Sequence, residues 1–312
     1  MKLHKEVVHE LAVQPGSAAG LGERSTKDTR ADWRAGAGIP SSKHAAKEEL
    51  EAFKKELEAA QELLYASDTW ALLLIFQAMD AGGKDGTIKH VMSGLNPQGC
   101  EVSSFKEPSG EELRHDFLWR CAKVLPERGK VGVFNRSYYE EVLVVRVHPE
   151  LLAPEHLPAG PQAGPKLWKE RLEDINGFER HLVRSGTRVV KFFLNVSKDE
   201  QARRFEERLD DPAKQWKFAP SDLAERQFFD AYLQAYEEAL TVTSTSWAPW
   251  YVVPADHKPT MRALVAGLVV DAVDQLGLHF PVVGKAQAEA LEQAKVALEP
   301  EREARAGGGK RH

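Results

Sequence analysis

Residues 69–90 join a continuous apolar run to a glycine-rich turn and then to a helix-permissive segment, TWALLLIFQAMDAGGKDGTIKH. The apolar part is too uniform for a half-exposed strand and too short for a buried helix, so it predicts a strand buried on both faces. Such a strand requires helices over both sides of its sheet. This segment therefore predicts an α/β fold whose first strand runs into a glycine-rich loop.

Four more apolar runs predict further strands of the same sheet. They span residues 100–105, 129–135, 187–195 and 249–255, of which the first is the weakest. Helical patterns lie at 110–125, 166–185, 198–209, 221–243 and 258–277, and at 43–66, where Ser41 or Ser42 is the expected N-cap. Strands that alternate with helices predict a parallel sheet, and ligands bind beyond the carboxyl ends of such strands. We therefore expect a three-layer fold with a five-stranded parallel sheet flanked by helices.

The composition limits the kinds of partner. A chain of 312 residues, 42% of them hydrophobic, can bury the core of one large domain, with or without a small appendage. The formal net charge of −5 excludes a generally basic nucleic-acid binder, so a polyanion would have to bind at a local cluster of Lys and Arg. With two cysteines and no pattern typical of a secretory signal or a membrane span, we expect a cytoplasmic protein with no nucleic-acid or membrane partner.

The two ends of the chain differ from the middle. Residues 1–42 are rich in Gly, Ala, Ser and charge without a sustained period, which predicts an extended N-terminal arm. Residues 43–282 carry the alternating pattern of the main domain, and residues 283–312 predict a C-terminal helix with a flexible tail.

The turn after the first strand is close to a phosphate-binding loop. The usual pattern, glycine, four residues and then Gly-Lys-Ser/Thr, fits at Gly83 and Lys84, but Ala78 replaces the first glycine and Asp85 replaces the hydroxyl that binds magnesium. A strand, a glycine-rich turn and a helix start present backbone N–H groups to an anion, and the Asp80 carboxylate would be available for magnesium instead. The alternative is a tight turn with an exposed lysine. The phosphate-binding residues predicted here are Gly82, Gly83, Lys84, Asp85, Gly86, Thr87 and Lys89.

A second candidate segment is GVFNRSYYEE, residues 132–141. The predicted strand ends at Asn135, whose carbonyl is a weak magnesium ligand, and Arg136 at the strand end is suited to bidentate contact with phosphate. The alternative is local, with Ser137 as a helix N-cap and Glu140 as its capping-box partner. Both functions are compatible in one segment.

The third candidate is the run RRFEERLDDPAKQWKFAPSD, residues 203–222. Arg204 and Arg208 share one face of a predicted helix at i and i+4, and Lys214 and Lys217 follow in a loop interrupted by proline. A solvated helix face is the default interpretation of such a run. Behind a phosphate-binding loop, the same run is typical of a closing lid, here residues 198–222, whose cations neutralise a transferring phosphoryl group.

These motifs together resemble polyphosphate kinase family 2, the polyphosphate:nucleotide phosphotransferases. The resemblance covers about residues 45–280 in colinear order and rests on residues 79–109, 134–150, 175–182 and 203–222. It implies a P-loop kinase fold similar to that of thymidylate kinase, with a helical lid. It also implies transfer of the terminal phosphoryl group of inorganic polyphosphate to an adenine or guanine nucleotide with Mg²⁺, or Mn²⁺, in a homodimer or homotetramer.

The resemblance also implies roles for single residues. Asp80 would bind the metal, Lys84 the transferring phosphates and Arg136 a phosphate at the second strand end. The lid would contribute Arg204, Arg208, Lys214 and Lys217. Many members have aspartate where Asn135 stands, and Asn135 with Glu140 resembles the class III subgroup, which accepts both AMP and ADP. Gly82 stands where many members have alanine, and we expect this exchange to matter little.

Two alternatives remain open from the sequence. An ATP-dependent nucleoside monophosphate kinase on the same fold would use ATP as its donor. A non-catalytic protein that binds polyphosphate or nucleotides would need the charged loop but not Asp80.

Overall fold

The computed structural model describes residues 3–27, 43–158, 164–218 and 220–308. The chain divides into two compact units, one that ends at Leu278 and one that begins at His279. Every candidate residue named above belongs to the first unit.

The first unit is built around the predicted five-stranded parallel sheet. Its strands are β1 (Ala71–Ala78), β2 (Cys100–Ser104), β3 (Val131–Asn135), β4 (Thr187–Asn195) and β5 (Trp250–Pro254). The order across the sheet is β2-β3-β1-β4-β5, and all four pairings are parallel. Every residue of β1 is buried, as its uniform apolar run predicts. The order places the loop after β1 between the carboxyl ends of β3 and β4, where a doubly wound sheet binds its ligand.

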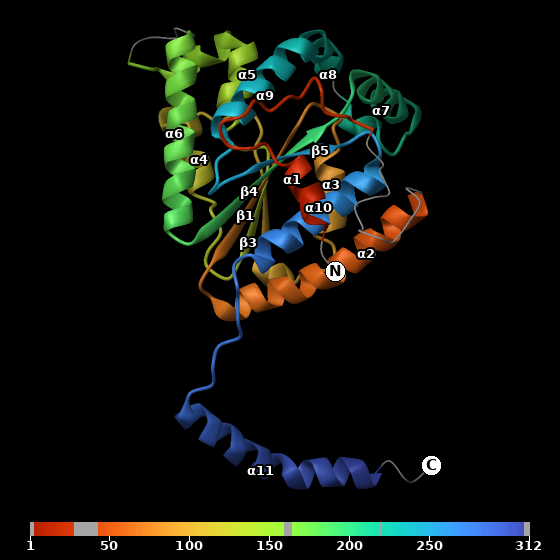
Figure 1. Cartoon of the computed structure of the whole chain (residues 1–312), viewed down its shortest axis with the longest axis vertical. Coiled ribbons are helices and arrows are strands. Elements are labelled where there is room, and N and C mark those ends of the chain that lie inside the picture. Colours follow the sequence, from red (N-terminus) through yellow and green to blue (C-terminus); the bar gives the residue numbers. More distant parts are fainter. Residues whose placement is uncertain (1–2, 28–42, 159–163, 219, 309–312) are drawn as a thin grey trace. The chain divides into compact units, whose positions relative to one another are not determined.

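Helices cover both faces of this sheet, which confirms the predicted α/β fold (Figure 1). One side carries α2 (Lys43–Ser67), α3 (Lys84–Val91) and α10 (Lys258–Asp274), and the other carries α5 (Glu140–Val147), α6 (Pro165–Arg184) and α9 (Phe229–Thr243). The predicted lid corresponds to α7 (Lys198–Asp210), a 3-10 turn (Gln215–Lys217) and α8 (Pro220–Glu225). None of the helices in the described ranges is both long and apolar enough to cross a membrane.

The helix predicted at residues 110–125 is wrong in its extent. The structure has a 3-10 turn, Glu112–Arg114, and a short helix, α4 (Trp119–Ala122). Asp116 lies between them, and its side chain accepts a hydrogen bond from the N–H of Leu118 at 3.0 Å. A short polar side chain that binds the backbone in this way competes with continuous helix. The predicted helix at 221–243 is likewise divided, by a 3-10 turn at Arg226–Phe228.

Residues 3–27 are not the extended arm that the sequence predicts. They contain a helix, α1 (Lys5–Leu11), and Ala12 forms an antiparallel bridge with Tyr251 of β5. The buried side chains of this segment are Leu3, Val13, Ala19 and Leu21. Arg24 holds the segment together, because its guanidinium donates to the carbonyl oxygens of residues 10, 11, 12 and 19. Residues 28–42, with the proposed N-caps Ser41 and Ser42, lie outside the described residues.

The second unit consists mainly of α11 (Lys285–Gly308).

A buried ion pair supports the segment that follows β3. Lys191 of β4 and Glu179 of α6 are fully buried, with 2.5 Å between Nζ and Oε2. The other Glu179 oxygen accepts hydrogen bonds from the hydroxyls of Tyr138 at 3.0 Å and Tyr139 at 2.9 Å. Lys191 also donates to the Thr243 carbonyl at 2.8 Å. The two tyrosines that anchor the chain directly after Arg136 are therefore fixed by a fully satisfied network.

We predict that Lys191→Met lowers the free energy of unfolding by about 3–5 kcal/mol, because it leaves Glu179 buried without its cation. Denaturant unfolding followed by tryptophan fluorescence measures this loss. The double variant Glu179→Gln/Lys191→Met should lose clearly less than the sum of the two single variants. Additive losses would contradict the pairing.

Candidate active site

The loop after β1 has a strained backbone that turns the chain into α3. The N–H of Gly82 donates to the carbonyl of Met79 at 3.0 Å, and Ala81 and Gly83 have positive φ values of 55° and 100°. A positive φ is unusual for a residue with a side chain, so Ala81 needs support from its surroundings. A Cβ atom on Gly82 would lie 2.6 Å from the Ala78 Cβ and 2.8 Å from the Met79 oxygen. The expectation that alanine at Gly82 matters little is therefore wrong for this loop conformation, which would have to shift.

Lys84 is folded into the loop. Its amine donates to the carbonyl oxygen of Ala78 at 2.8 Å, and only 9% of the residue is exposed. The pKa of the Lys84 amine is lowered to about 8, mainly by burial and also by the positive charge of Arg136, against the attraction of Asp80, Glu140 and Asp85. An anion in the loop would stabilise the protonated amine and raise this pKa.

Arg136 at the end of β3 is held between two carboxylates. Its N–H donates to the carbonyl of Phe76 in β1 at 3.0 Å, and its own φ is +66°. Its guanidinium contacts Asp80 Oδ1 at 3.1 Å and Glu140 Oε2 at 3.3 Å. The Glu140 charge, followed by that of Asp80, raises the pKa of Arg136. The structure thus brings three of the predicted catalytic residues into one contact group beside the loop.

The capping box proposed for Ser137 and Glu140 is not formed. The first helical residue of α5 is Glu140, and Ser137 Oγ accepts from the N–H of Tyr139 at 3.2 Å. The Glu140 carboxylate binds Arg136 instead of a backbone N–H. Glu140 is therefore directed toward the site, as its functional interpretation requires.

Asn135 and Asp85 meet on the β3 side of α3. The Asn135 amide donates to Asp85 Oδ1 at 2.8 Å and to Ser104 Oγ at 3.5 Å. Asp85 is exposed in the first turn of α3. Within the described ranges, no three His, Cys, Asp or Glu side chains are grouped closely enough to hold a metal ion alone.

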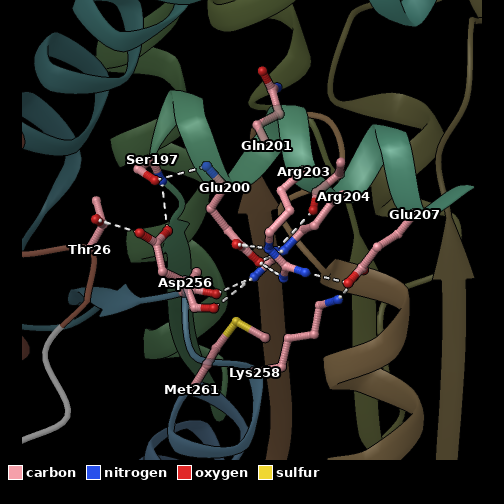
Figure 2. A network of polar contacts seen from close by, with 12 residues as sticks. Thr26, Ser197, Glu200, Gln201, Arg203, Arg204, Glu207, Asp256, Lys258 and Met261 are labelled. Atoms are coloured by element: carbon pink, nitrogen blue, oxygen red, sulfur yellow. Dashed lines mark hydrogen bonds and ion pairs between the residues drawn. The ribbon is translucent and has the colours of Figure 1, made fainter.

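Arg204 is buried beside the loop and does not lie on the solvated helix face that is the default interpretation of its sequence run (Figure 2). Its guanidinium donates to the carbonyls of Ala81, at 3.0 Å, and Ala255, and its Nε binds Glu200 at 2.7 Å. The residue after Ala255 is Asp256, which accepts from Ser197 N–H at 2.8 Å and from Thr26 Oγ1 at 2.9 Å. Arg204 therefore connects the loop to α7, to the end of β5 and, through Asp256, to the N-terminal segment.

The other predicted phosphate-binding residues differ in their position relative to the loop. Thr87 is buried, and its hydroxyl donates to the Gly83 carbonyl at 3.0 Å, while Lys89 is exposed in the last turn of α3. In the lid, Lys214 pairs with Asp211 at 2.6 Å, and the Arg208 guanidinium lies 5.2 Å from the centroid of the Phe205 ring. The side chain of Lys217 lies outside the described residues.

Two adjoining cavities open beside Arg136 and Glu140. The smaller, of about 160 Å³, is lined by residues that include Asp80, Gln201, Tyr232 and Tyr236. The larger, of about 440 Å³, extends toward residues 106–120 and 148–155. Arg136, Glu140, Val144, Glu225 and Tyr232 line both. The chain thus provides room for a small organic ligand next to the charged cluster.

Several residues that line the smaller cavity were not predicted from the sequence, among them Gln201, Tyr232 and Tyr236. Gln201 donates to the Asp80 carbonyl at 2.9 Å, and its own side-chain oxygen is buried without a partner in the described structure. Tyr232 and Tyr236 share one face of α9 at i and i+4. In sequence, such a pair is indistinguishable from an ordinary core face, whereas Gln201 lies one turn before Arg204 and carries no signal of its own.

Comparison with known proteins identifies the family of this chain. Residues 40–279 match the family model described as polyphosphate kinase 2. The chain belongs to the polyphosphate kinase 2 family. It is therefore a phosphotransferase of that family, as the resemblance of the motifs predicts.

Two curated relatives cover most of the chain. An ADP-polyphosphate phosphotransferase of Rhodopseudomonas palustris is 53% identical over 244 residues, which are 78% of this chain and 84% of the relative. An AMP/ADP-polyphosphate phosphotransferase of Meiothermus ruber is 43% identical over 269 residues, 86% of this chain and 94% of the relative.

Among solved structures, the crystal structure of polyphosphate kinase 2 from Arthrobacter aurescens TC1 is similar to this chain, with a TM-score of 0.82 at 39% identity. The match covers 94% of this chain and 99% of that one. The predicted P-loop kinase architecture is thereby confirmed.

We predict that binding of inorganic triphosphate at pH 8.5 is coupled to proton uptake at Lys84, because the amine is mostly neutral above its pKa of about 8 and the anion favours the charged form. Anion affinity should fall as the pH rises through 8. Titration calorimetry in buffers of different ionisation enthalpy should show about 0.7 more protons taken up by the wild type than by Lys84→Arg, which stays charged. Equal uptake in both proteins would contradict the shifted pKa.

Proposed function

We propose that this chain transfers the terminal phosphoryl group of inorganic polyphosphate to AMP and to ADP, forming ADP and ATP. The observation that carries the proposal is the contact of Arg136 with both Asp80 and Glu140 at the mouth of the loop that holds Lys84. The names of the two curated relatives support polyphosphate as the donor. Neither fixes the acceptor, since one names ADP alone and the other names AMP and ADP.

The transfer itself needs little proton chemistry. An oxygen of the acceptor phosphate attacks the terminal phosphorus of polyphosphate, and the bond to the bridging oxygen breaks, so that the chain leaves one unit shorter. The attacking oxygen is already ionised, so a general base is not required. Lys84 and Arg136 stabilise the charge that develops on the transferring group, because a preorganised cation in a partly buried site costs no reorganisation during the reaction.

Magnesium fits the donor set of this site. Mg²⁺ is usually held by one or two carboxylates together with substrate phosphates, so the absence of a three-carboxylate cluster in the described ranges does not oppose it. Asp80 would be its ligand, with the Asn135 carbonyl as a weaker one, and Mn²⁺ has the same oxygen preference. When bound, the ion neutralises phosphate charge and orients the reacting oxygens.

Glu140 acts on the acceptor together with Arg136, whose guanidinium it contacts. The carboxylate lies one helical turn from Arg136 and lines both cavities. It therefore sets the charge that an incoming nucleotide phosphate meets. AMP carries less negative charge than ADP, so a carboxylate at this place should disfavour ADP relative to AMP.

The donor is tested by supplying purified protein with magnesium, long-chain polyphosphate and AMP or ADP, in the absence of ATP. Nucleotide chromatography should show ADP and then ATP from AMP. Lys84→Ala should lower turnover by about 100-fold or more, since it removes a cation at the transferring group. Lys166→Ala, an exposed lysine of α6, is the matched control. Activity that appears only when ATP is supplied with a monophosphate would replace the proposal with a conventional kinase.

Glu140→Ala should raise the ratio of kcat/KM for ADP to that for AMP by about fivefold, the size of a ~1 kcal/mol electrostatic difference. Steady-state rates with each acceptor at saturating polyphosphate measure the ratio. Glu170→Ala on the exposed side of α6 is the control. A ratio unchanged in Glu140→Ala would remove this residue from acceptor selection.

A homodimer or homotetramer and a cytoplasmic location remain predictions from the resemblance and the composition.

A further inference from the structure

The N-terminal segment, residues 3–27, extends to the edge of the sheet at which the phosphate-binding loop lies. It is not part of the family match, which begins at residue 40. The segment lies against α9 and β5 (Figure 1), and the N–H groups of Gly20 and Leu21 donate to the two carboxylate oxygens of Glu237 in α9 at 2.8 and 2.7 Å. Its last described residues then contact the chain directly after β5.

Thr26 and Asp256 bind each other twice at this edge. The Thr26 hydroxyl donates to Asp256 Oδ2 at 2.9 Å, and the N–H of Asp256 donates to the Thr26 carbonyl at 3.0 Å. The other carboxylate oxygen, Oδ1, accepts from the N–H of Ser197 at 2.8 Å (Figure 2). Ser197 is the N-cap of α7, and its hydroxyl accepts from the N–H of Glu200 at 3.1 Å. The orientation of the Asp256 carboxylate is therefore set by the N-terminal segment at one oxygen and by the start of α7 at the other.

Asp256 lies where Arg204 is held. Arg204 follows Ser197 by two turns of α7, and its guanidinium binds the carbonyl of Ala255 and, at 3.5 Å, that of Asp256. The same guanidinium donates to the carbonyl of Ala81, whose φ of 55° needs support from its surroundings. A reoriented Asp256 would move both the helix that carries Arg204 and the carbonyls that Arg204 binds. A continuous series of hydrogen bonds thus links Thr26 to the loop.

We propose that Thr26 is a positioning residue for phosphoryl transfer, which acts through Asp256 and Arg204 to hold the loop in the shape that places Lys84. The proposal rests on the proposed function for its reaction and adds a residue from outside the family match. Transfer requires the reacting groups to be closely aligned, so a small displacement of Lys84 lowers the rate of the reaction more than the affinity for a nucleotide.

The test is the effect of Thr26→Val, which keeps the size of the side chain and removes its hydroxyl. With polyphosphate and ADP, kcat should fall about fivefold or more, while the KM for ADP stays within about twofold of the wild type. Thr26→Ser, which retains the hydroxyl, should keep kcat within about twofold.

The matched control is Thr241→Val. The Thr241 hydroxyl accepts from the N–H of Ala19 at 2.9 Å, so this variant also removes one hydrogen bond of the N-terminal segment, but at α9 and not at Asp256. Its kcat should stay within about twofold of the wild type.

Three kinetic results would overturn the proposal. An unchanged kcat in Thr26→Val removes this residue from the positioning of the loop. A loss of kcat in Thr26→Ser as large as that in Thr26→Val shows that the hydroxyl is not the group that acts. An equal loss in Thr241→Val shows a general effect of the packing of the segment.

Hydrogen–deuterium exchange tests the same link without a substrate. Thr26→Val should accelerate exchange at residues 79–88 by about threefold or more, whereas Thr241→Val should keep the wild-type rates there. If the wild type shows no polyphosphate-dependent transfer, the proposed function fails by itself, and this measurement still tests the link. Faster exchange of Thr26→Val confined to residues 3–27 would reject it.

Discussion

The buried guanidinium of Arg204 joins three segments that are distant in the sequence, and the shape of the phosphate-binding loop depends on it. It holds the carbonyl of Ala81, whose positive φ is unfavourable for a residue with a side chain, against the carbonyl of Ala255 after β5. Glu200 balances its charge from one turn away on α7. In a medium of low polarity these charge-assisted hydrogen bonds are strong, and a carbonyl that lost them would be left unsatisfied. These contacts thus hold the loop in place from the β5 side before any ligand binds.

A second group of contacts holds the loop from the β3 side. Arg136 has an unusual backbone conformation, its N–H binds β1, and the buried tyrosines that follow it are fixed by Glu179 and Lys191. The Arg136 guanidinium is therefore held in one position, between Asp80 and Glu140. Because β1 lies between β3 and β4, the two groups of contacts act on opposite flanks of the loop. The loop is therefore held in place from both sides.

The fold and the centre of the site were predictable because they depend on strong local patterns. Strands buried on both faces need uniform apolar runs, and parallel strands bring Asp80, Lys84 and Arg136 to one edge of the sheet. The burial of Arg204 was not predicted, because a basic residue on a helix has the same pattern whether it faces water or backbone carbonyls. The N-terminal segment was missed because its order comes from Arg24 and from a bridge to β5, neither of which gives a periodic signal.

Hydrogen–deuterium exchange of the peptide that contains residues 79–88 tests most directly whether Arg204 fixes the shape of the loop. The Arg204→Lys variant is compared with the wild type. The lysine keeps the charge but cannot reach two carbonyls and Glu200 at once. If Arg204 shapes the loop, exchange in this peptide accelerates by about tenfold or more while peptides from β4 and α6 keep their wild-type rates. Unchanged exchange at residues 79–88, together with weakened triphosphate binding, would show instead that Arg204 acts as a phosphate ligand and that the loop holds its shape without it.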